Sequence, residues 1–131
     1  MTADDVESSA LAKLVLAESE RSALLTHLRG ATRWVTSLLT VTEVHRSAAR
    51  RGPTQAGQAD GVLGQFLFLD IDRQVIEVAA QLQPATLRTL DAIHVASALQ
   101  LGAESRSFVT YDQRLADAAR TAGLPVVSPG T

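Results

Sequence analysis

The chain has 131 residues, of which 46% are hydrophobic and 20% are charged, with a net charge of −2 and no cysteine. These values are ordinary for a globular protein, and they exclude a disulfide framework, a zinc–thiolate site and thiol catalysis. The slightly acidic balance argues against a general nucleic-acid coat. We expect one domain over residues 1–131, able to bury roughly two-thirds of its extended surface.

The N-terminal segment MTADDVESS is acidic and has no apolar stretch, so we expect no signal peptide. The apolar runs elsewhere are too short to span a membrane. We therefore expect a soluble, cytoplasmic protein.

Segments typical of strands and of helices alternate along the chain. The continuous apolar run QFLFL is typical of a buried parallel strand. The segment Leu87 to Leu101 is apolar nearly all round, which predicts a central packed helix. The alternation predicts an α/β fold, a parallel sheet with helices on both faces. The expected strands are 5–7, 34–36, 65–69, 107–110 and 125–127; the expected helices are 9–16, 19–28, 38–50, 55–65, 73–80, 87–101 and 115–122, with a loose stretch at 50–61 where two helical segments meet.

Four acidic residues adjoin the expected strands. Glu7 ends the first strand, and Asp112 follows the fourth. Asp91 lies in the first turn of its helix, and Glu43 lies in the helix after the second strand. Because ligands of parallel sheets collect at the carboxyl ends of the strands, we expect all four to face one cleft.

A cluster of carboxylates is stable only when a cation neutralises it, because like charges raise one another's pKa. Oxygen donors without cysteine or paired histidines favour a hard ion such as Mg²⁺ or Mn²⁺. A hard ion held on carboxylates is the usual apparatus for cleaving phosphodiesters. The four acids therefore predict a metal-dependent nuclease.

Four segments, in this order, resemble the PIN-domain family, and within it the VapC-type ribonuclease toxins of bacterial toxin–antitoxin pairs: ESSALAKLVL, TSLLTVTEVHRSAARR, LRTLDAIHVASALQLG and SFVTYDQRLADAARTAGLPVVSPG. The resemblance implies a three-layer α/β/α sandwich around a small parallel sheet, and cleavage of RNA with Mg²⁺ or Mn²⁺. It also implies a homodimer and a VapB-like antitoxin that enters the cleft. The family's four metal-binding and catalytic acids fall on Glu7, Glu43, Asp91 and Asp112.

The first acidic position departs from the family, which usually has aspartate in a D-[ST]-S-A pattern where this chain has Glu7-Ser8-Ser9-Ala10. The added methylene either weakens metal affinity or favours Mn²⁺, because Mg²⁺ demands near-ideal octahedral geometry. Asp5 lies two residues further back, and we do not expect it to substitute. The alternative to an active enzyme is a weakened PIN-like module that binds RNA or an antitoxin without turnover.

The arginines near these acids each have two possible roles, one structural and one in RNA binding. Arg46 and Arg50 follow Glu43 on the same helical face, so they either pair with it or present RNA phosphates. Arg88 lies one turn before Asp91 and either holds that carboxylate or touches the substrate.

The hydroxyls of Ser8, Ser9 and Thr110 either support metal ligands or cap helices. His94 is at i+3 from Asp91, and we expect a packed or partly exposed polar tip rather than a ligand. The expected helices at 19–28 and 55–65 have apolar faces available for a homodimer.

One rival motif is FLFLDID, which looks like the strand end of haloacid-dehalogenase-type phosphatases, with Asp70 as nucleophile. That chemistry normally needs a lysine late in the chain, and the single lysine here is Lys13. Asp72 is adequately explained as the cap of the helix that follows. We therefore favour the nuclease.

Overall fold

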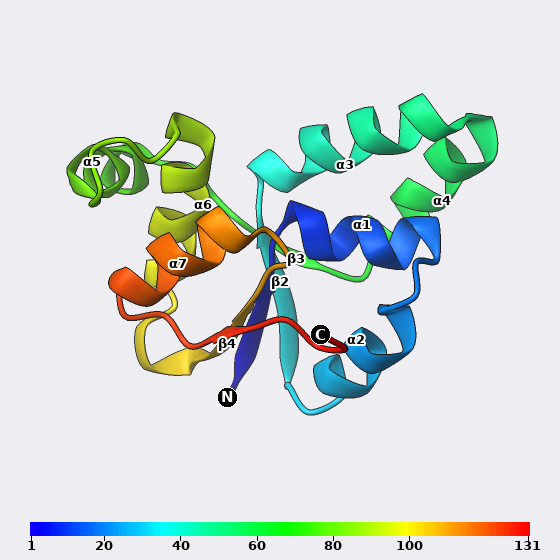
Figure 1. The fold of residues 1–131 in the computed structure, drawn as a ribbon, viewed down its shortest axis with the longest axis horizontal. Coiled ribbons are helices and arrows are strands. Elements are labelled where there is room, and N and C mark those ends of the chain that lie inside the picture. Colours follow the sequence, from blue (N-terminus) through cyan, green and yellow to red (C-terminus); the bar gives the residue numbers. More distant parts are fainter.

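Five parallel strands form one sheet in the computed structural model, which describes residues 1–131 (Figure 1). The strand order is β3-β2-β1-β4-β5, so the first strand lies at the centre. Because every pairing is parallel, all the strands end at one edge of the sheet. The strands are β1 (Ala3–Val6), β2 (Arg33–Ser37), β3 (Leu67–Leu69), β4 (Ser105–Val109) and β5 (Val126–Val127).

Seven α-helices cover the two faces of the sheet, with α1 to α4 on one side and α5 to α7 on the other (Figure 1). The result is the three-layer α/β/α sandwich that the sequence predicted. No helix has both the length and the apolar character needed to cross a membrane. The helices are α1 (Ser8–Leu16), α2 (Arg21–Leu28), α3 (Leu39–Arg51), α4 (Pro53–Leu63), α5 (Arg73–Gln81), α6 (Thr89–Leu99) and α7 (Gln113–Thr121), with a 3₁₀ turn at Gly102–Glu104.

Alternation along the strands divides the core into two main layers. Val6 and Val109 are paired neighbours that face α1 to α4, where they join the larger apolar cluster. Phe108, one residue earlier, packs with α6 and α7 in the second cluster. The buried side chains of α6 confirm that it is a central packed helix.

The predicted buried strand at 65–69 is wrong in its burial. Only Leu67–Leu69 is a strand, and it lies at the edge of the sheet beside β2. Leu67 and Phe68 are 55% and 40% exposed, whereas Phe66 just before the strand is buried. An edge strand has a neighbour on one side only, so its apolar residues are less completely covered.

The stretch predicted to be loose, 50–61, is mostly helical. The helices α3 and α4 meet at Gly52, whose φ of 134° is a conformation that favours glycine. Pro53 follows at the first position of α4, where its missing N–H has no helical partner to lose. The predicted meeting of two helices is therefore confirmed, but the connection is a single residue.

Candidate active site

The carboxyl ends of the strands open into a cavity of about 460 Å³ that lies between α1 and α3 on one side and α6 and α7 on the other. All four predicted acids line this cavity, which we call the acidic cleft. Each comes from a different part of the chain, so the parallel topology brings them together. The lining residues are Glu7, Ser8, Ser9, Glu43, Arg88, Thr89, Leu90, Asp91, His94 and Asp112.

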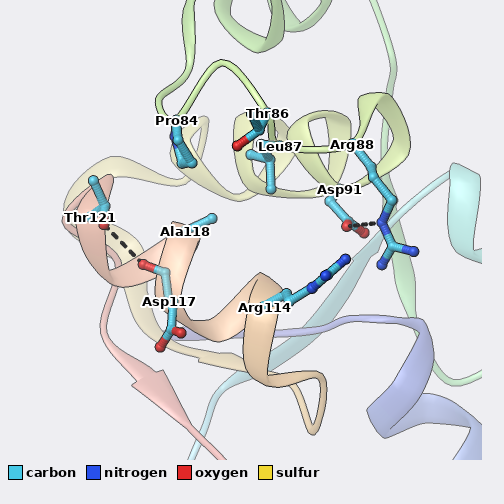
Figure 2. A pocket seen from close by; sticks show the side chains of 9 residues that line it. All are labelled: Pro84, Thr86, Leu87, Arg88, Asp91, Arg114, Asp117, Ala118 and Thr121. Atoms are coloured by element: carbon cyan, nitrogen blue, oxygen red, sulfur yellow. Dashed lines mark hydrogen bonds and ion pairs between the residues drawn. The ribbon is translucent and has the colours of Figure 1, made fainter.

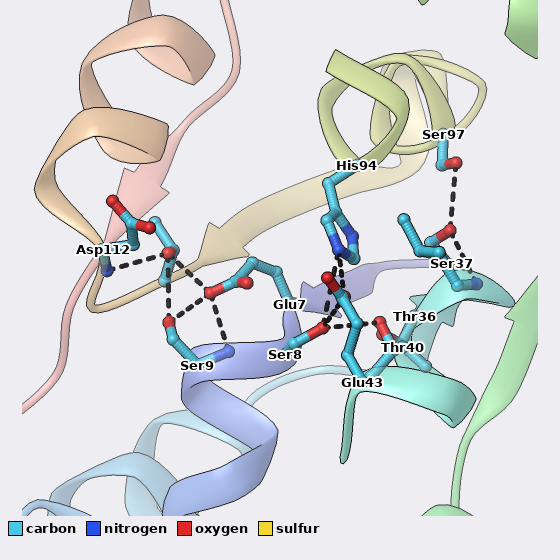
Figure 3. A network of polar contacts seen from close by, with 12 residues as sticks. Glu7, Ser8, Ser9, Thr36, Ser37, Thr40, Glu43, His94, Ser97 and Asp112 are labelled. Atoms are coloured by element: carbon cyan, nitrogen blue, oxygen red, sulfur yellow. Dashed lines mark hydrogen bonds and ion pairs between the residues drawn. The ribbon is translucent and has the colours of Figure 1, made fainter. Parts of the chain in front are cut away.

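Glu7 follows β1 directly and is the N-cap of α1, so the predicted first strand, 5–7, is shifted to Ala3–Val6. Its Oε1 atom accepts hydrogen bonds from the Ser9 backbone N–H (3.0 Å), the Ser9 hydroxyl and the Thr110 hydroxyl (2.7 Å) (Figure 3). All three donors meet one oxygen, so Oε2 has no protein donor. Burial raises the pKa of Glu7 above its usual value, and these hydrogen bonds offset only part of the rise.

Glu43 lies on α3 and meets a histidine from the opposite side of the cleft. Its Oε1 atom lies 2.6 Å from Nε2 of His94 and accepts a hydrogen bond from the Ser8 hydroxyl (Figure 3). Burial acts to raise the pKa of Glu43, but the hydrogen bonds from His94 and Ser8 outweigh it, so the pKa lies below its usual value. Glu43 is therefore held as a carboxylate.

His94 is 3% exposed, which agrees with the prediction of a packed residue. Its contact with Glu43 was not predicted. Burial acts to lower its pKa, but the hydrogen bond to Glu43 and the negative charges of Glu43, Glu7 and Asp5 raise the pKa above its usual value. His94 therefore takes up a proton more readily than a free histidine does. His94 is the main cleft residue that sequence reasoning underrated.

Asp91 and Asp112 share one arginine. Nε of Arg88 lies 3.1 Å from Oδ2 of Asp91, and its Nη2 lies 3.8 Å from Oδ2 of Asp112. Asp112 is also the N-cap of α7, where Oδ1 accepts from the Leu115 backbone N–H at 3.2 Å. Of the two readings of Arg88, the structure has the one in which it holds Asp91, but its side chain is 63% exposed and free to leave.

Asp5 was set aside in favour of Glu7, and it lies on the face of β1 that meets α6. It is 2% exposed, and its Oδ2 has no hydrogen-bond partner. Burial raises the pKa of Asp5 to about 8, so the carboxyl is protonated at neutral pH. A neutral buried group does not compete with Glu7 for a cation. The sequence shows that Asp5 lies two residues before Glu7 and on the same face of the strand, but it does not show that Asp5 is buried.

The remaining predicted neighbours divide clearly. The Ser8 and Thr110 hydroxyls contact Glu43 and Glu7 respectively, so they touch the acids rather than only capping helices. Arg46 is exposed at the surface of α3 and makes no ion pair with Glu43. Arg50 is likewise exposed and makes no such pair. The reading in which these arginines neutralise Glu43 is wrong.

The cleft fits a hard cation in its chemistry but not in the present side-chain positions. Its donors are carboxylate oxygens, of which Oε2 of Glu7 and Oδ1 of Asp91 make no hydrogen bond within the protein. No three acidic or histidine side chains are grouped closely enough to hold an ion between them, since Arg88 and His94 take up part of the negative charge. Arg88, which is 63% exposed, would have to leave Asp91 and Asp112 before these oxygens could converge on an ion.

The rival phosphatase motif gains no support. Asp72 is the N-cap of α5 and accepts from the Val75 backbone N–H at 3.0 Å, as predicted. Lys13 pairs with Glu20 at 3.2 Å and lies 4.8 Å above the ring of Tyr111, away from Asp70. No lysine is therefore available to a phosphoryl group on β3.

Comparison with known proteins gives a consistent result. The PIN domain model matches residues 6–121. Ribonuclease VapC46 of Mycobacterium tuberculosis (strain ATCC 25618 / H37Rv) is 39% identical over 129 residues, which cover 98% of this chain and 99% of the relative.

Two solved structures share the fold. Mycobacterium tuberculosis VapC20, described as a Sarcin-Ricin loop cleaving toxin, has a TM-score of 0.74 at 17% identity, covering 96% of this chain and 99% of its own. A toxin-antitoxin complex from Klebsiella pneumoniae has a TM-score of 0.68 at 23% identity, covering 95% and 97%. The chain belongs to the PIN-domain family, and within it to the group of proteins named ribonuclease VapC.

Proposed function

We propose that residues 1–131 form one PIN domain that acts in the cytoplasm as a metal-dependent endoribonuclease, the toxin of a toxin–antitoxin pair. The observation that carries the proposal is the meeting of Glu7, Glu43, Asp91 and Asp112 in one cavity, although they come from four separate elements. Arg88 and His94 offset only part of the negative charge of four gathered carboxylates, and a bound ion would offset the rest. The relative named ribonuclease VapC46 supports the reaction class.

The donor set suits Mg²⁺ or Mn²⁺, and Glu7, Asp91 and Asp112, with Glu43 beside them, are the residues that would hold the ion. When bound, such an ion lowers the pKa of a water and stabilises charge on the phosphoryl oxygens. Oε2 of Glu7 could bind the ion while Oε1 keeps its hydrogen bonds to Ser9 and Thr110.

The protein's own residues prepare the site for an anionic substrate. The Nε2 atom of His94 donates to Oε1 of Glu43 and keeps that carboxylate ionised and fixed in direction. Arg88 is exposed, so it can leave Asp91 and Asp112 for an RNA phosphate once a cation balances the two acids. Arg46 is exposed on α3, three residues after Glu43, and makes no ion pair, so we expect it to be available to a phosphate beyond the cleft.

We also propose a protein partner and self-association. The Klebsiella pneumoniae neighbour is a toxin-antitoxin complex, which supports a VapB-like antitoxin for this chain. The apolar faces of α2 and α4 do not support a homodimer, because Leu24, Leu28, Ala59 and Leu63 lie in the core. The exposed apolar residues available for a homodimer or an antitoxin lie instead on β3 and on α5 and α6.

The proposal is tested by incubating the protein with structured RNA in Mg²⁺, in Mn²⁺ and in EDTA. We expect cleavage with at least one metal, none in EDTA, and a loss of at least about 100-fold for Asp91→Asn. Asp70→Asn is the matched control, since it removes an exposed carboxylate outside the cleft. Cutting that persists in EDTA, or an Asp91→Asn variant as active as Asp70→Asn, would refute the proposal.

A further inference from the structure

A second cavity adjoins the acidic cleft and shares two of its residues, Arg88 and Asp91 (Figure 2). It has a volume of about 450 Å³ and lies between α7 and the segment that leads into the first turn of α6 (Figure 2). We call it the α6–α7 cavity. Its lining residues are Pro84, Thr86, Leu87, Arg88, Asp91, Arg114, Asp117, Ala118 and Thr121.

Two arginines stand where this cavity meets the acidic cleft. Arg114 is an exposed residue in the first turn of α7, and its side chain extends toward Asp91 and Arg88 (Figure 2). It makes no ion pair or side-chain hydrogen bond within the protein, whereas the two arginines nearest to it in this part of the fold, Arg88 and Arg120, are paired with Asp91 and Asp117. The guanidinium group therefore offers its full set of donors to a ligand, and its planar fork matches a phosphate.

The rest of the α6–α7 cavity suits a base rather than a second phosphate. Asp117 also lines it; its carboxylate is 78% exposed, pairs with Arg120 at 3.5 Å and points away from Pro84 and Leu87 (Figure 2), and its negative charge disfavours a second phosphate. Pro84, Leu87 and Ala118 supply apolar surface to the cavity. The volume lies in the range of small-molecule sites and accommodates one nucleotide.

We propose that the α6–α7 cavity binds one nucleotide of single-stranded RNA next to the bond that is cut, with Arg114 on its phosphate and its base against Pro84, Leu87 and Ala118. The inference rests on the proposed ribonuclease function and extends it. The strand then passes from the acidic cleft over Arg88 into this cavity, so the two cavities are consecutive subsites for one chain of phosphates.

The test compares Arg114→Gln with Arg29→Gln. Arg29 is also exposed and also makes no side-chain hydrogen bond or ion pair, so both variants remove one free charge. It lies between α2 and the start of β2, away from the carboxyl ends of the strands where the acidic cleft opens. Binding of a fluorescein-labelled single-stranded RNA is measured in Ca²⁺ at several salt concentrations. Steady-state cleavage is measured in Mg²⁺ or Mn²⁺.

For Arg114→Gln we expect about tenfold weaker binding, and a slope of log affinity against log salt that is lower by about 0.7, the value for one phosphate contact to a single strand. The KM should rise by a similar factor while kcat stays within about twofold, since the contact is uniform in ground and transition states. Arg29→Gln should match the parent in all four quantities.

Equal affinity and equal salt slope for the two variants, with the parent still cutting RNA, would overturn the subsite and leave the ribonuclease function standing. A fall in kcat at constant KM would also overturn it, because Arg114 would then act by holding Asp91. A parent that neither binds nor cuts RNA with any metal would remove the proposed function, and the subsite with it.

Discussion

Nε2 of His94 and Oε1 of Glu43 lie 2.6 Å apart, although the two residues are 51 positions apart in the sequence. One comes from α6 and the other from α3, so the bond joins the two walls of the acidic cleft across the end of the sheet (Figure 3). A buried histidine in this position fixes the direction of Glu43 and keeps it charged. Because its short contact is with Glu43, we expect it to act as a positioning residue.

The first prediction concerns this bond. His94→Ala should lower kcat or the apparent metal affinity by about 10–100-fold, the usual range for partners that orient a metal ligand. His94→Gln should restore part of the loss, because its amide N–H can still donate to Glu43, whereas a purely structural defect would not be rescued in this way. The measurement is cleavage at varied metal concentration, with circular dichroism as the check on folding. An alanine variant with the parent's kcat and metal affinity would show that Glu43 needs no orienting partner.

The second prediction concerns the departure at position 7. In Glu7→Asp the shorter side chain removes a methylene, which should improve activity with Mg²⁺ relative to Mn²⁺, since Mg²⁺ tolerates less distortion of its coordination. The ratio of the two rates, parent against variant, is the quantity to measure. If the parent is inert with both metals while Glu7→Asp cuts, the chain is a module that binds without turnover. If both proteins cut, glutamate is a working ligand at this position.

The meeting of the four acids was predictable because it follows from topology. Once the strands are parallel, residues that follow them must share an edge, and Glu7 and Asp112 do so as helix N-caps. The hydrogen bond between Glu43 and His94 was not predictable. The spacing of three residues from Asp91 places His94 on the same side of α6, but it does not show which side chain of another helix lies opposite. The exposure of Leu67 was hidden for a similar reason, since an apolar run does not reveal which strand is at the edge.

The third prediction concerns a second polar cluster, which lies near the amino ends of β1 and β4, away from the acidic cleft. The side chain of His27 lies 2.9 Å from the Ser107 hydroxyl and 3.5 Å from Asp4, with Arg106 beside it. Burial lowers the pKa of His27 below its usual value of 6.5; Asp4 opposes this shift, and the positive charge of Arg106 adds to it. The unfolded chain therefore takes up this proton more readily than the folded one.

A lowered histidine pKa means that stability is present above pH 6.5 and is lost as the pH falls through 6.5 toward the folded-state pKa. Urea unfolding at pH 7.5 and 5.5 should thus show a larger fall for the parent than for His27→Gln. His45 is the control of opposite sign, because its hydrogen bond to Asp60 raises its pKa. Equal pH slopes for the parent and His27→Gln would contradict the assignment.

The fourth prediction concerns Gly30, where an added Cβ would lie 2.5 Å from Nη1 of Arg106. That guanidinium cannot easily withdraw, because its Nε and Nη2 atoms each lie 3.0 Å from an oxygen of Asp4, which is fully buried. Displacing it would leave a buried carboxylate without its cation, a loss that is strongly destabilising. Gly30→Ala should therefore lower the free energy of unfolding by about 1–3 kcal/mol.

The control for this substitution is Gly57→Ala in α4, where nothing lies within 4 Å of the new Cβ. Replacing glycine by alanine inside an open helical position normally stabilises by about 0.4–1 kcal/mol, because it restricts the unfolded chain. Both variants add one methyl group, but only the one at Gly30 meets another side chain. Urea unfolding should therefore give changes of opposite sign in the free energy of unfolding. A stabilised Gly30→Ala protein would mean that Arg106 can move without losing Asp4, and that the pair is less fixed than its two 3.0 Å contacts indicate.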